Sequence, residues 1–266
     1  MDAQLFFQAE MPRGEIYQTA AGQAGVFSTR SPDKTTPNED AAALVPRNGH
    51  AGILIVADGM GGLPAGEQAS SLAIRELLSQ IEEAPADDPS LRAAILDGLE
   101  RANRTVSELG VGAGTTMAIA EIQGRTVRPY HVGDSMILVV GQRGKIKLQT
   151  VSHSPVGYAV ESGLLDEAEA MNHEDRHLIS NMLGTPDMRI EVGSTIELAR
   201  YDTLLLASDG LFDNLTIDEI VERIRKGPLR KVVDRLASDC QRRMQAPEPG
   251  EPSKPDDLTF IAFRCG

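Results

Sequence analysis

Apolar runs of strand length recur along the chain, and this pattern limits the fold more than any other feature. The runs cover residues 50–57, 115–122, 126–132, 135–140, 145–151, 203–207 and 258–264. Gln123-Gly124 and Arg143-Gly144 stand between neighbouring runs, as hairpin turns do. The sequence therefore predicts consecutive antiparallel strands from about residue 115 to residue 151.

Helical periodicity appears in four segments, which cover residues 66–83, 89–109, 217–225 and 229–244. Asp88 before Pro89 predicts the start of the second helix, and Thr216 with Glu219 matches a capping box before the third. Helices segregated from mostly antiparallel strands indicate an α+β fold, built as a layered sandwich. The proline-rich stretch 247–255 excludes a helix and is predicted to be a loop inside one domain, 1–266.

Composition excludes several classes of protein. The 266 residues carry a net charge of -13, which argues against nucleic-acid and anionic-membrane binding because phosphate contacts need clustered Lys and Arg. The chain has no apolar run of about 20 residues and no signal-peptide pattern at its start. Cys240 and Cys265 form no CxxC pair, which excludes a cysteine zinc site and suits a reducing compartment. We expect a cytoplasmic monomer.

Acidic residues stand where the apolar runs begin or end. Asp58 and Asp209 follow two of the runs, Asp134 lies in a turn between two others, and the pairs Glu39-Asp40 and Asp256-Asp257 precede apolar runs. If these runs are neighbouring strands, the carboxylates gather at one edge of a sheet. Each one alone is more often an ordinary turn former. Their recurrence, with Gly59 and Gly210 as neighbours, favours a metal site.

Crowded carboxylates raise one another's pKa, and a bound divalent cation removes the repulsion between them. Ligands that are all oxygen, without His or Cys, suit Mg²⁺ or Mn²⁺ rather than Zn²⁺. The pattern therefore predicts a site for one of these two ions.

Six short motifs in order carry a resemblance to a known family. They are Asn38-Glu39-Asp40, VADGMGG at 56–62 with Gly66-Glu67, Gly114-Thr115-Thr116, Val132-Gly133-Asp134-Ser135, SDGLFDN at 208–214, and Asp256-Asp257-Leu258-Thr259. Together they span most of the chain, which resembles the metal-dependent protein phosphatase 2C (PPM) family of bacterial Ser/Thr phosphatases. The resemblance implies a four-layer α-β-β-α sandwich of two antiparallel sheets flanked by helix pairs, and phosphoserine or phosphothreonine proteins as substrates.

The resemblance also implies roles for individual residues around two Mn²⁺ or Mg²⁺ ions. Asp58 bridges both ions, Glu39 and the Gly59 carbonyl hold one, and Asp209 and Asp256 hold the other. Asp40 orders the waters bound to the metals, and Asp134 matches a third, weaker site of bacterial members. A water that bridges two cations loses a proton near neutral pH and attacks phosphorus in line.

The chain departs from the family pattern at the residue that grips substrate phosphate. The family has an arginine four residues before Glu39, and this chain has Thr35. Lys34 and Arg30 are the candidates to replace this arginine, and with Asp58 and Asp209 they make up the predicted catalytic residues. Both cations are equally well explained as solvated surface residues.

Three further departures concern single positions or a segment. Met60 stands where eukaryotic members often have His, and Asp257 stands where many members have Asn, adding charge near the metals. Residues 152–184 resemble the family's variable flap. Within it, His153 and His173 are open between substrate contacts and ordinary loop residues.

Three functions remain open from the sequence. The first is an active Ser/Thr phosphatase that acts on phosphorylated proteins and opposes a cognate kinase. The second is a catalytically weak family member that works as a regulatory binding module, suggested by the missing arginine and the altered flap. The third is an acidic adaptor without metal, which would fold fully in chelator.

Overall fold

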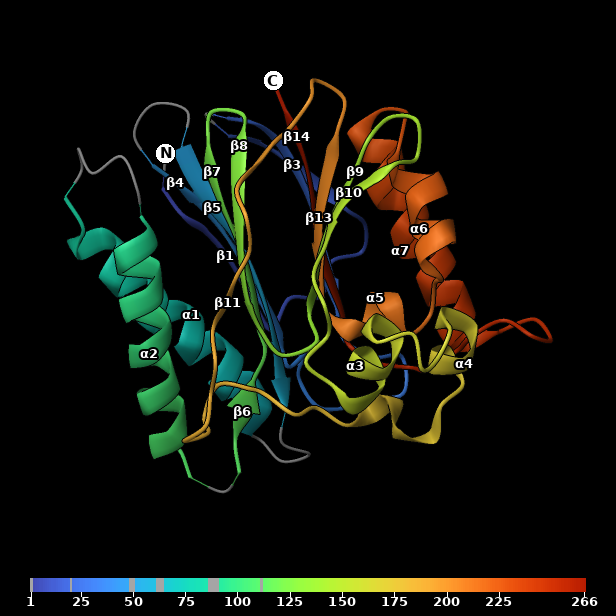
Figure 1. Cartoon of the computed structure of the whole chain (residues 1–266), viewed down its shortest axis with the longest axis horizontal. Coiled ribbons are helices and arrows are strands. Elements are labelled where there is room, and N and C mark those ends of the chain that lie inside the picture. Colours follow the sequence, from blue (N-terminus) through green and yellow to red (C-terminus); the bar gives the residue numbers. More distant parts are fainter. Residues whose placement is uncertain (1, 20, 48–50, 61–64, 86–90, 111) are drawn as a thin grey trace.

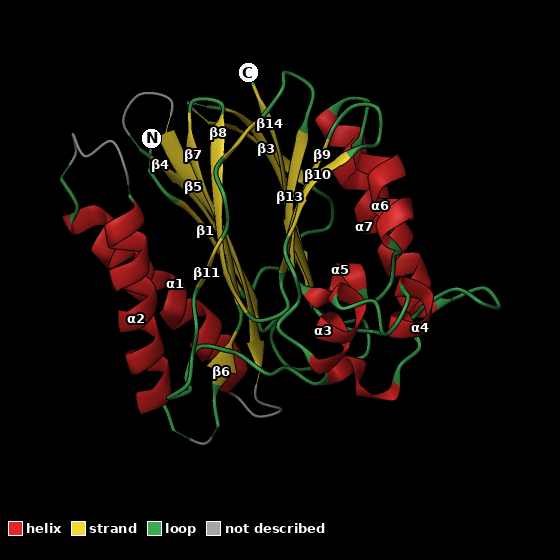
Figure 2. Ribbon diagram, in the orientation of Figure 1, coloured by secondary structure: helices red, strands yellow, loops and turns green. Residues whose placement is uncertain are grey.

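A computed structural model describes the chain except for residues 1, 20, 48–50, 61–64, 86–90 and 111. Two antiparallel β-sheets lie face to face, and a pair of long helices covers the outer face of each sheet (Figure 1). Figure 2 shows the strands of both sheets in the middle and the helices outside them. The predicted α+β sandwich with four layers is therefore confirmed.

The strands divide between two sheets. The first has the order β1-β4-β5-β7-β8-β11, with β12 paired to β8 and β6 paired to β5. Its members are β1 (Gln4–Phe7), β4 (Asp40–Pro46), β5 (Ala51–Met60), β6 (Gly114–Thr115), β7 (Met117–Gln123), β8 (Thr126–Val132), β11 (Glu191–Val192) and β12 (Ile196–Glu197). The second has the order β10-β9-β13-β14-β3-β2. Its members are β2 (Glu15–Thr19), β3 (Gly22–Thr29), β9 (Met136–Val140), β10 (Ile146–Gln149), β13 (Thr203–Ala207) and β14 (Leu258–Cys265).

Aliphatic cores fill the interfaces between the layers. Helices α1 (Ala65–Glu83) and α2 (Arg92–Glu108) pack on the first sheet, and α6 (Ile217–Ile224) and α7 (Leu229–Gln245) pack on the second. A third core lies between the sheets. The shorter helices are α3 (Pro155–Glu161), α4 (Glu167–Met171), the 3₁₀ helix η1 (Glu174–His177) and α5 (Asp209–Phe212). None of the helices in the described ranges is both long and apolar enough to span a bilayer.

The four predicted long helices are present, with one start shifted. The Thr216–Glu219 capping box forms in both directions at α6, as its sequence indicated. Helix α2 begins at Arg92, and the predicted cap Asp88-Pro89 lies outside the described residues, as do His50, Gly61 and Gly62 of the sequence patterns.

The predicted strand meander is wrong at one point. The hairpins β7–β8 and β9–β10 form as expected, but β8 and β9 belong to different sheets. The chain crosses between the sheets at Gly133-Asp134-Ser135, where Gly133 has φ +100 and a Cβ there would lie 2.6 Å from the Thr116 side chain. The predicted strand 115–122 is also divided, because Thr116 separates β6 from β7. Strands β1, β2, β3, β11 and β12 were not predicted from the sequence.

The strand ends that carry acidic residues meet at one end of the sandwich. Asp40 opens β4 and lies directly opposite Asp58 of β5. Ala207, the last residue of β13, pairs with both Met136 of β9 and Phe260 of β14. The turn before β9, the end of β13 and the start of β14 are therefore neighbours. Figure 1 shows β6 and α5 at this end and both chain termini at the opposite end.

The close approach of α1 and α2 allows a test of the packing beneath the first sheet. A Cβ on Gly98 of α2 would lie 2.7 Å from Leu77 Cδ1 of α1. Valine has a higher helix propensity than glycine, so helix propensity alone would make Gly98→Val stabilising. Any loss of stability in this variant therefore reports the clash. We expect Gly98→Val to lower the free energy of unfolding in urea by about 2 kcal/mol. Ala93→Val, at an exposed position of the same helix, is the control, and an equal effect of both changes would contradict the packing.

Candidate active site

Asp40 and Asp58 form the centre of a group of acidic side chains, which we call the carboxylate cluster. Its members are Glu39, Asp40, Asp58, Asp134, Asp209, Asp213, Asp256 and Asp257. Asp40 is buried, and its Oδ2 accepts a hydrogen bond of 2.8 Å from Ser208 Oγ. Its Oδ1 is also buried and has no hydrogen-bond partner among the described residues. Burial, then the charge of Asp257, raises the pKa of Asp40 well above its usual range.

The strand-end residues predicted from the sequence do meet. Burial raises the pKa of Asp58 well above its usual range, and the charges of Asp40, Asp209, Asp256 and Asp134 add to this effect. Asp134, in the crossing between the sheets, has its pKa raised to about 8 by burial and by Asp209. The same two causes raise the pKa of Asp256 to about 6. The cluster therefore holds more negative charge than its surroundings neutralise.

Glu39 and the Gly59 carbonyl face the same space at the start of α1. A Cβ on Gly66 would lie 2.3 Å from Glu39 Oε1 and 2.9 Å from the Gly59 oxygen. A Cβ on Gly59 would lie 2.0 Å from the Gly66 oxygen, so the backbones of β5 and α1 approach too closely for a side chain. Ser70 Oγ donates to the Glu39 carbonyl at 2.6 Å and fixes the loop that presents Glu39.

Two lysines place their ammonium groups among the carboxylates. Lys34 Nζ lies 2.7 Å from Glu39 Oε2 and 2.9 Å from Asp257 Oδ2. Burial alone would lower the pKa of Lys34. The two hydrogen bonds to Glu39 and Asp257 raise this pKa by more than burial lowers it, so the pKa lies above its usual value. Lys254 Nζ lies 2.7 Å from Asp209 Oδ2. The structure does not join Arg30 to this group, because its described ion pair is with the exposed Glu10, at 3.1 Å.

The place of Lys254 and the role of Asp257 were not predicted from the sequence. Lys254 stands between two prolines and two residues before Asp256, which is the one local signal that could have drawn attention to it. Asp257 was expected only to add charge. Its Oδ1 accepts from Ser31 N at 2.7 Å and its Oδ2 from Glu39 N at 2.8 Å, so it fixes the loop that leads to Glu39.

The donor set of the cluster fits a hard divalent cation. The available atoms are carboxylate oxygens and a backbone carbonyl, which are the ligands of Mg²⁺ and Mn²⁺. Asp40 Oδ1 and Asp134 Oδ1 are buried without hydrogen-bond partners in the described part of the chain, and such atoms need a cation or water. No three of the cluster's carboxylates, within the described ranges, bring oxygens within 4.8 Å of one another. The lysine ammonium groups stand between them instead.

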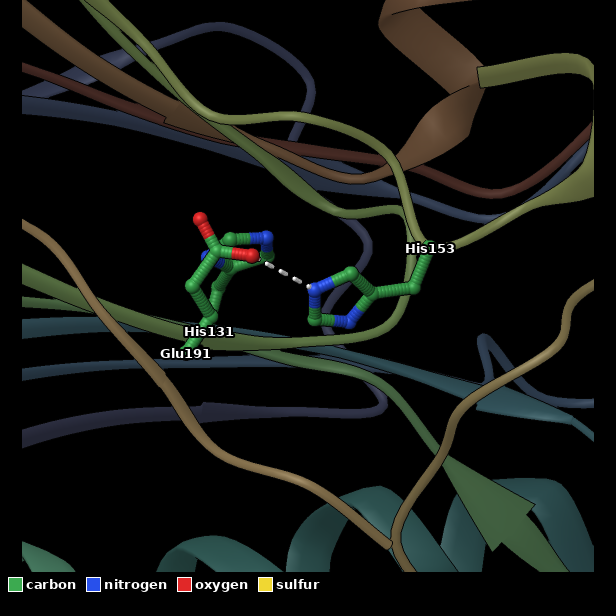
Figure 3. Close-up of side chains that lie close together, drawn as sticks. All are labelled: His131, His153 and Glu191. Carbon is green, nitrogen blue, oxygen red and sulfur yellow. Dashed lines mark hydrogen bonds and ion pairs between the residues drawn. The ribbon is translucent and has the colours of Figure 1, made fainter. Parts of the chain in front are cut away.

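A second group of potential ligands lies beside the cluster. His131, His153 and Glu191 bring one atom each within 4.8 Å of one another, and the two imidazole rings stack at 4.3 Å (Figure 3). His153 Nδ1 accepts from Gly133 N at 3.0 Å and from Asn181 Nδ2 at 2.8 Å. The proton of His153 is therefore on Nε2, which donates to Glu191 Oε2 at 3.1 Å.

These hydrogen bonds explain the histidine group without a metal. A metal on His153 Nε2 would require a proton on Nδ1, where two N–H donors already point. His131 Nε2 lies 3.0 Å from the Val151 carbonyl and must donate to it. Burial lowers the pKa of His131. The group thus joins the crossing turn at Gly133 to the segment 152–184, and His153 is a buried structural residue.

Comparisons with known proteins identify relatives of the chain in sequence and in structure. The sequence model of the protein phosphatase 2C family matches residues 29–246. A serine/threonine phosphatase Stp of Listeria welshimeri is 31% identical over 198 residues, 71% of this chain and 77% of the relative. The serine/threonine phosphatase structure of S. agalactiae aligns with a TM-score of 0.78 and 28% identity, covering 91% of this chain and 99% of that one. The PstP catalytic domain in complex with two manganese ions aligns with a TM-score of 0.72 and 26% identity, covering 91% and 96%.

The raised carboxyl pKa values predict how stability in chelator depends on pH. The pKa is about 8 for Asp134 and about 6 for Asp256 in the folded chain, against an ordinary aspartate pKa of 3.8. Between the ordinary pKa of each group and its raised pKa, the folded chain binds more protons than the unfolded chain, so the stability of the fold falls as pH rises. In EDTA, the melting temperature should decline from pH 5 to pH 8.

Asp134→Asn tests this assignment. The melting temperature of the variant should decline less steeply than that of the wild type between pH 5 and pH 8, because one of the side chains that is protonated in the folded chain no longer titrates. Mn²⁺ should flatten the profile of the wild-type protein by stabilising the ionised carboxylates. A wild-type melting temperature that rises over this range in EDTA would contradict the charge balance described above.

Proposed function

The chain belongs to the protein phosphatase 2C family, and we propose that it hydrolyses phosphoserine and phosphothreonine in proteins with two divalent cations at the carboxylate cluster. It is a protein serine/threonine phosphatase, as its named relatives are. The observation that carries the proposed mechanism is the gathering of strand-end carboxylates around buried oxygens that lack partners. The relatives give no support to the alternative of a catalytically weak binding module.

We assign the proposed ligands by position. Glu39 Oε1 and the Gly59 carbonyl would hold one ion, since both face the space above Gly66. Asp209 and Asp256 would hold the other, and Asp58, whose pKa each of them raises, would lie between the two ions. Manganese and magnesium both suit these oxygen ligands.

Asp40 and Asp134 have different proposed tasks. Asp40 is oriented by Ser208, and its second oxygen is left to order the waters around the ions. Asp134 lies in the crossing turn and offers a partnerless oxygen for a third, weaker site. Both residues would thus act through an oxygen that accepts no hydrogen bond from the described part of the chain.

The chemistry that two bound cations supply is a nucleophilic water at neutral pH and the neutralisation of charge on the phosphoryl oxygens. The residues of the chain position the phosphate. Lys34 has a compact positive charge at the mouth of the cluster, and we propose that it binds substrate phosphate in place of the missing arginine. Arg30, 43% exposed, would attract the substrate from further out.

The substrates follow from the family as phosphorylated proteins. We propose that they are products of a cognate Ser/Thr kinase, and that the phosphatase acts as a monomer in the cytoplasm. The net charge of -13 agrees with a protein that does not bind nucleic acid.

Hydrolysis of p-nitrophenyl phosphate and of a phosphothreonine peptide tests the function. We expect turnover with Mn²⁺ or Mg²⁺, none in EDTA, and a loss of at least about 100-fold in kcat/KM for Asp209→Ala, because the variant lacks a proposed metal ligand. Asp218→Ala, an exposed acidic residue in the first turn of α6, is the control for charge and should keep its activity. Full turnover in EDTA, or an active Asp209→Ala variant, would overturn the two-metal proposal.

Removal of Lys34 and removal of Arg30 should change the KM for the phosphopeptide by different amounts. Lys34→Met should raise KM for the phosphopeptide by about tenfold, because it removes a cation that lies at the cluster. Arg30→Met should change KM by less than about threefold, because exposed charges act weakly at a distance. Steady-state kinetics at fixed ionic strength measure both values. A larger effect of Arg30→Met than of Lys34→Met would reverse the assignment.

A further inference from the structure

Lys254 extends into the carboxylate cluster and makes ionic contacts there with three acidic side chains. Its Nζ lies 2.7 Å from Asp209 Oδ2, 2.7 Å from Asp213 Oδ2 and 3.4 Å from Asp256 Oδ2. The contacts with Asp209 and Asp213 are hydrogen bonds, and the contact with Asp256 is an ion pair, so three carboxylates surround the ammonium group. The contacts resemble those of a bound inorganic cation more than those of a surface ion pair.

Hydrogen bonds to Asn214 fix the backbone of Lys254. Asn214 is fully buried, and its side-chain oxygen accepts from Lys254 N at 2.9 Å while its amide group donates to the Lys254 carbonyl at 2.8 Å. Pro252 and Pro255 on either side restrict the chain further. The loop thus holds the root of the side chain in place, while its four methylene groups leave the ammonium group free to move.

The carboxylates that Lys254 contacts include a pair with a proposed second task. Asp209 and Asp256 are the two residues assigned above to one divalent ion. A magnesium or manganese ion binds carboxylate oxygen at about 2.0–2.2 Å, whereas the ammonium nitrogen stays near 3 Å. The two cations would repel each other strongly if both stayed on the same oxygens. A divalent ion that uses the Oδ2 atoms of Asp209 and Asp256 therefore competes with the ammonium group for them.

We propose that Lys254 is a tethered competitor of the divalent cation at Asp209 and Asp256, so that metal binding displaces its ammonium group. This inference rests on the proposed two-metal function and adds that a residue of the chain itself limits the affinity for the ion. The opposite role would be preorganisation, in which Lys254 holds the carboxylates ready for the ion. The two roles predict opposite changes in affinity when the lysine is removed.

Metal titration of a Lys254→Met variant separates these roles. We would remove metal from the full-length protein with chelator, exchange the chelator away, and measure Mn²⁺ binding by calorimetry. A competitor gives Lys254→Met roughly tenfold tighter Mn²⁺ binding than the wild-type protein, since coupling between competing ligands has this size. Lys254→Gln, which keeps a donor without the charge, should gain less. Lys231→Met, an exposed lysine on α7, is the control for net charge and should match the wild type.

Thermal unfolding provides a second readout that does not depend on activity. In EDTA, Lys254→Met should melt below the wild type, because three carboxylates lose their cation. Saturating Mn²⁺ should then raise its melting temperature more than it raises that of the wild type. A variant that folds poorly in EDTA still reports through this difference.

The outcomes distinguish the inference from the function on which it rests. Equal or weaker Mn²⁺ binding by Lys254→Met, beside a wild type that binds Mn²⁺, would overturn the competitor role and leave the two-metal function standing. No Mn²⁺ binding by either protein would overturn both. Tighter binding in Lys231→Met as well would assign the effect to net charge and reject the local competition.

Discussion

Repulsion among the acidic side chains at one end of the sandwich is the constraint on which this site depends. Two like charges 4 Å apart repel by about 4 kcal/mol when the effective dielectric constant is near 20. The chain offsets the repulsion in three ways. Some groups take up protons, as Asp134 does with a pKa of about 8. Lys34 and Lys254 add positive charge, and Asp257 accepts two backbone N–H groups. Cations from solution would supply the rest.

A network of small polar side chains joins the two sheets beneath the cluster. Ser208 Oγ donates to Asp40 Oδ2 and accepts from Thr259 N at 3.1 Å, while Thr259 Oγ1 lies 2.7 Å from Ser28 Oγ. Asn38 Nδ2 donates to Ser28 Oγ at 3.0 Å. These residues are buried, and a buried polar group without a partner costs about 1–3 kcal/mol. The network thus fixes the distance between the sheet edges and aims one oxygen of Asp40 at the cluster.

The positions of Asp58 and Asp209 could be predicted because an apolar run stops just before each of them, and that is a local property. The destination of the chain after Gly133-Asp134 could not. A hairpin and a crossing between sheets need the same turn residues, and only long-range pairing decides which sheet the next strand joins. The position of Lys254 in the cluster could not be predicted for a similar reason. It depends on Asn214, which lies 40 positions earlier in the sequence.

The segment 152–184 is bound to both turns that bring charge to the cluster. His153 N donates to the Gly133 carbonyl at 3.1 Å, beside Asp134. Arg176 Nη2 donates to the Ser253 carbonyl at 3.3 Å, beside Lys254. Both contacts are made to backbone carbonyls of the turns, so neither contact depends on where the charged side chain of its turn points. In the proposed exchange, rotation of the Lys254 side chain would release its ammonium group without breaking either of these hydrogen bonds, because neither involves that side chain.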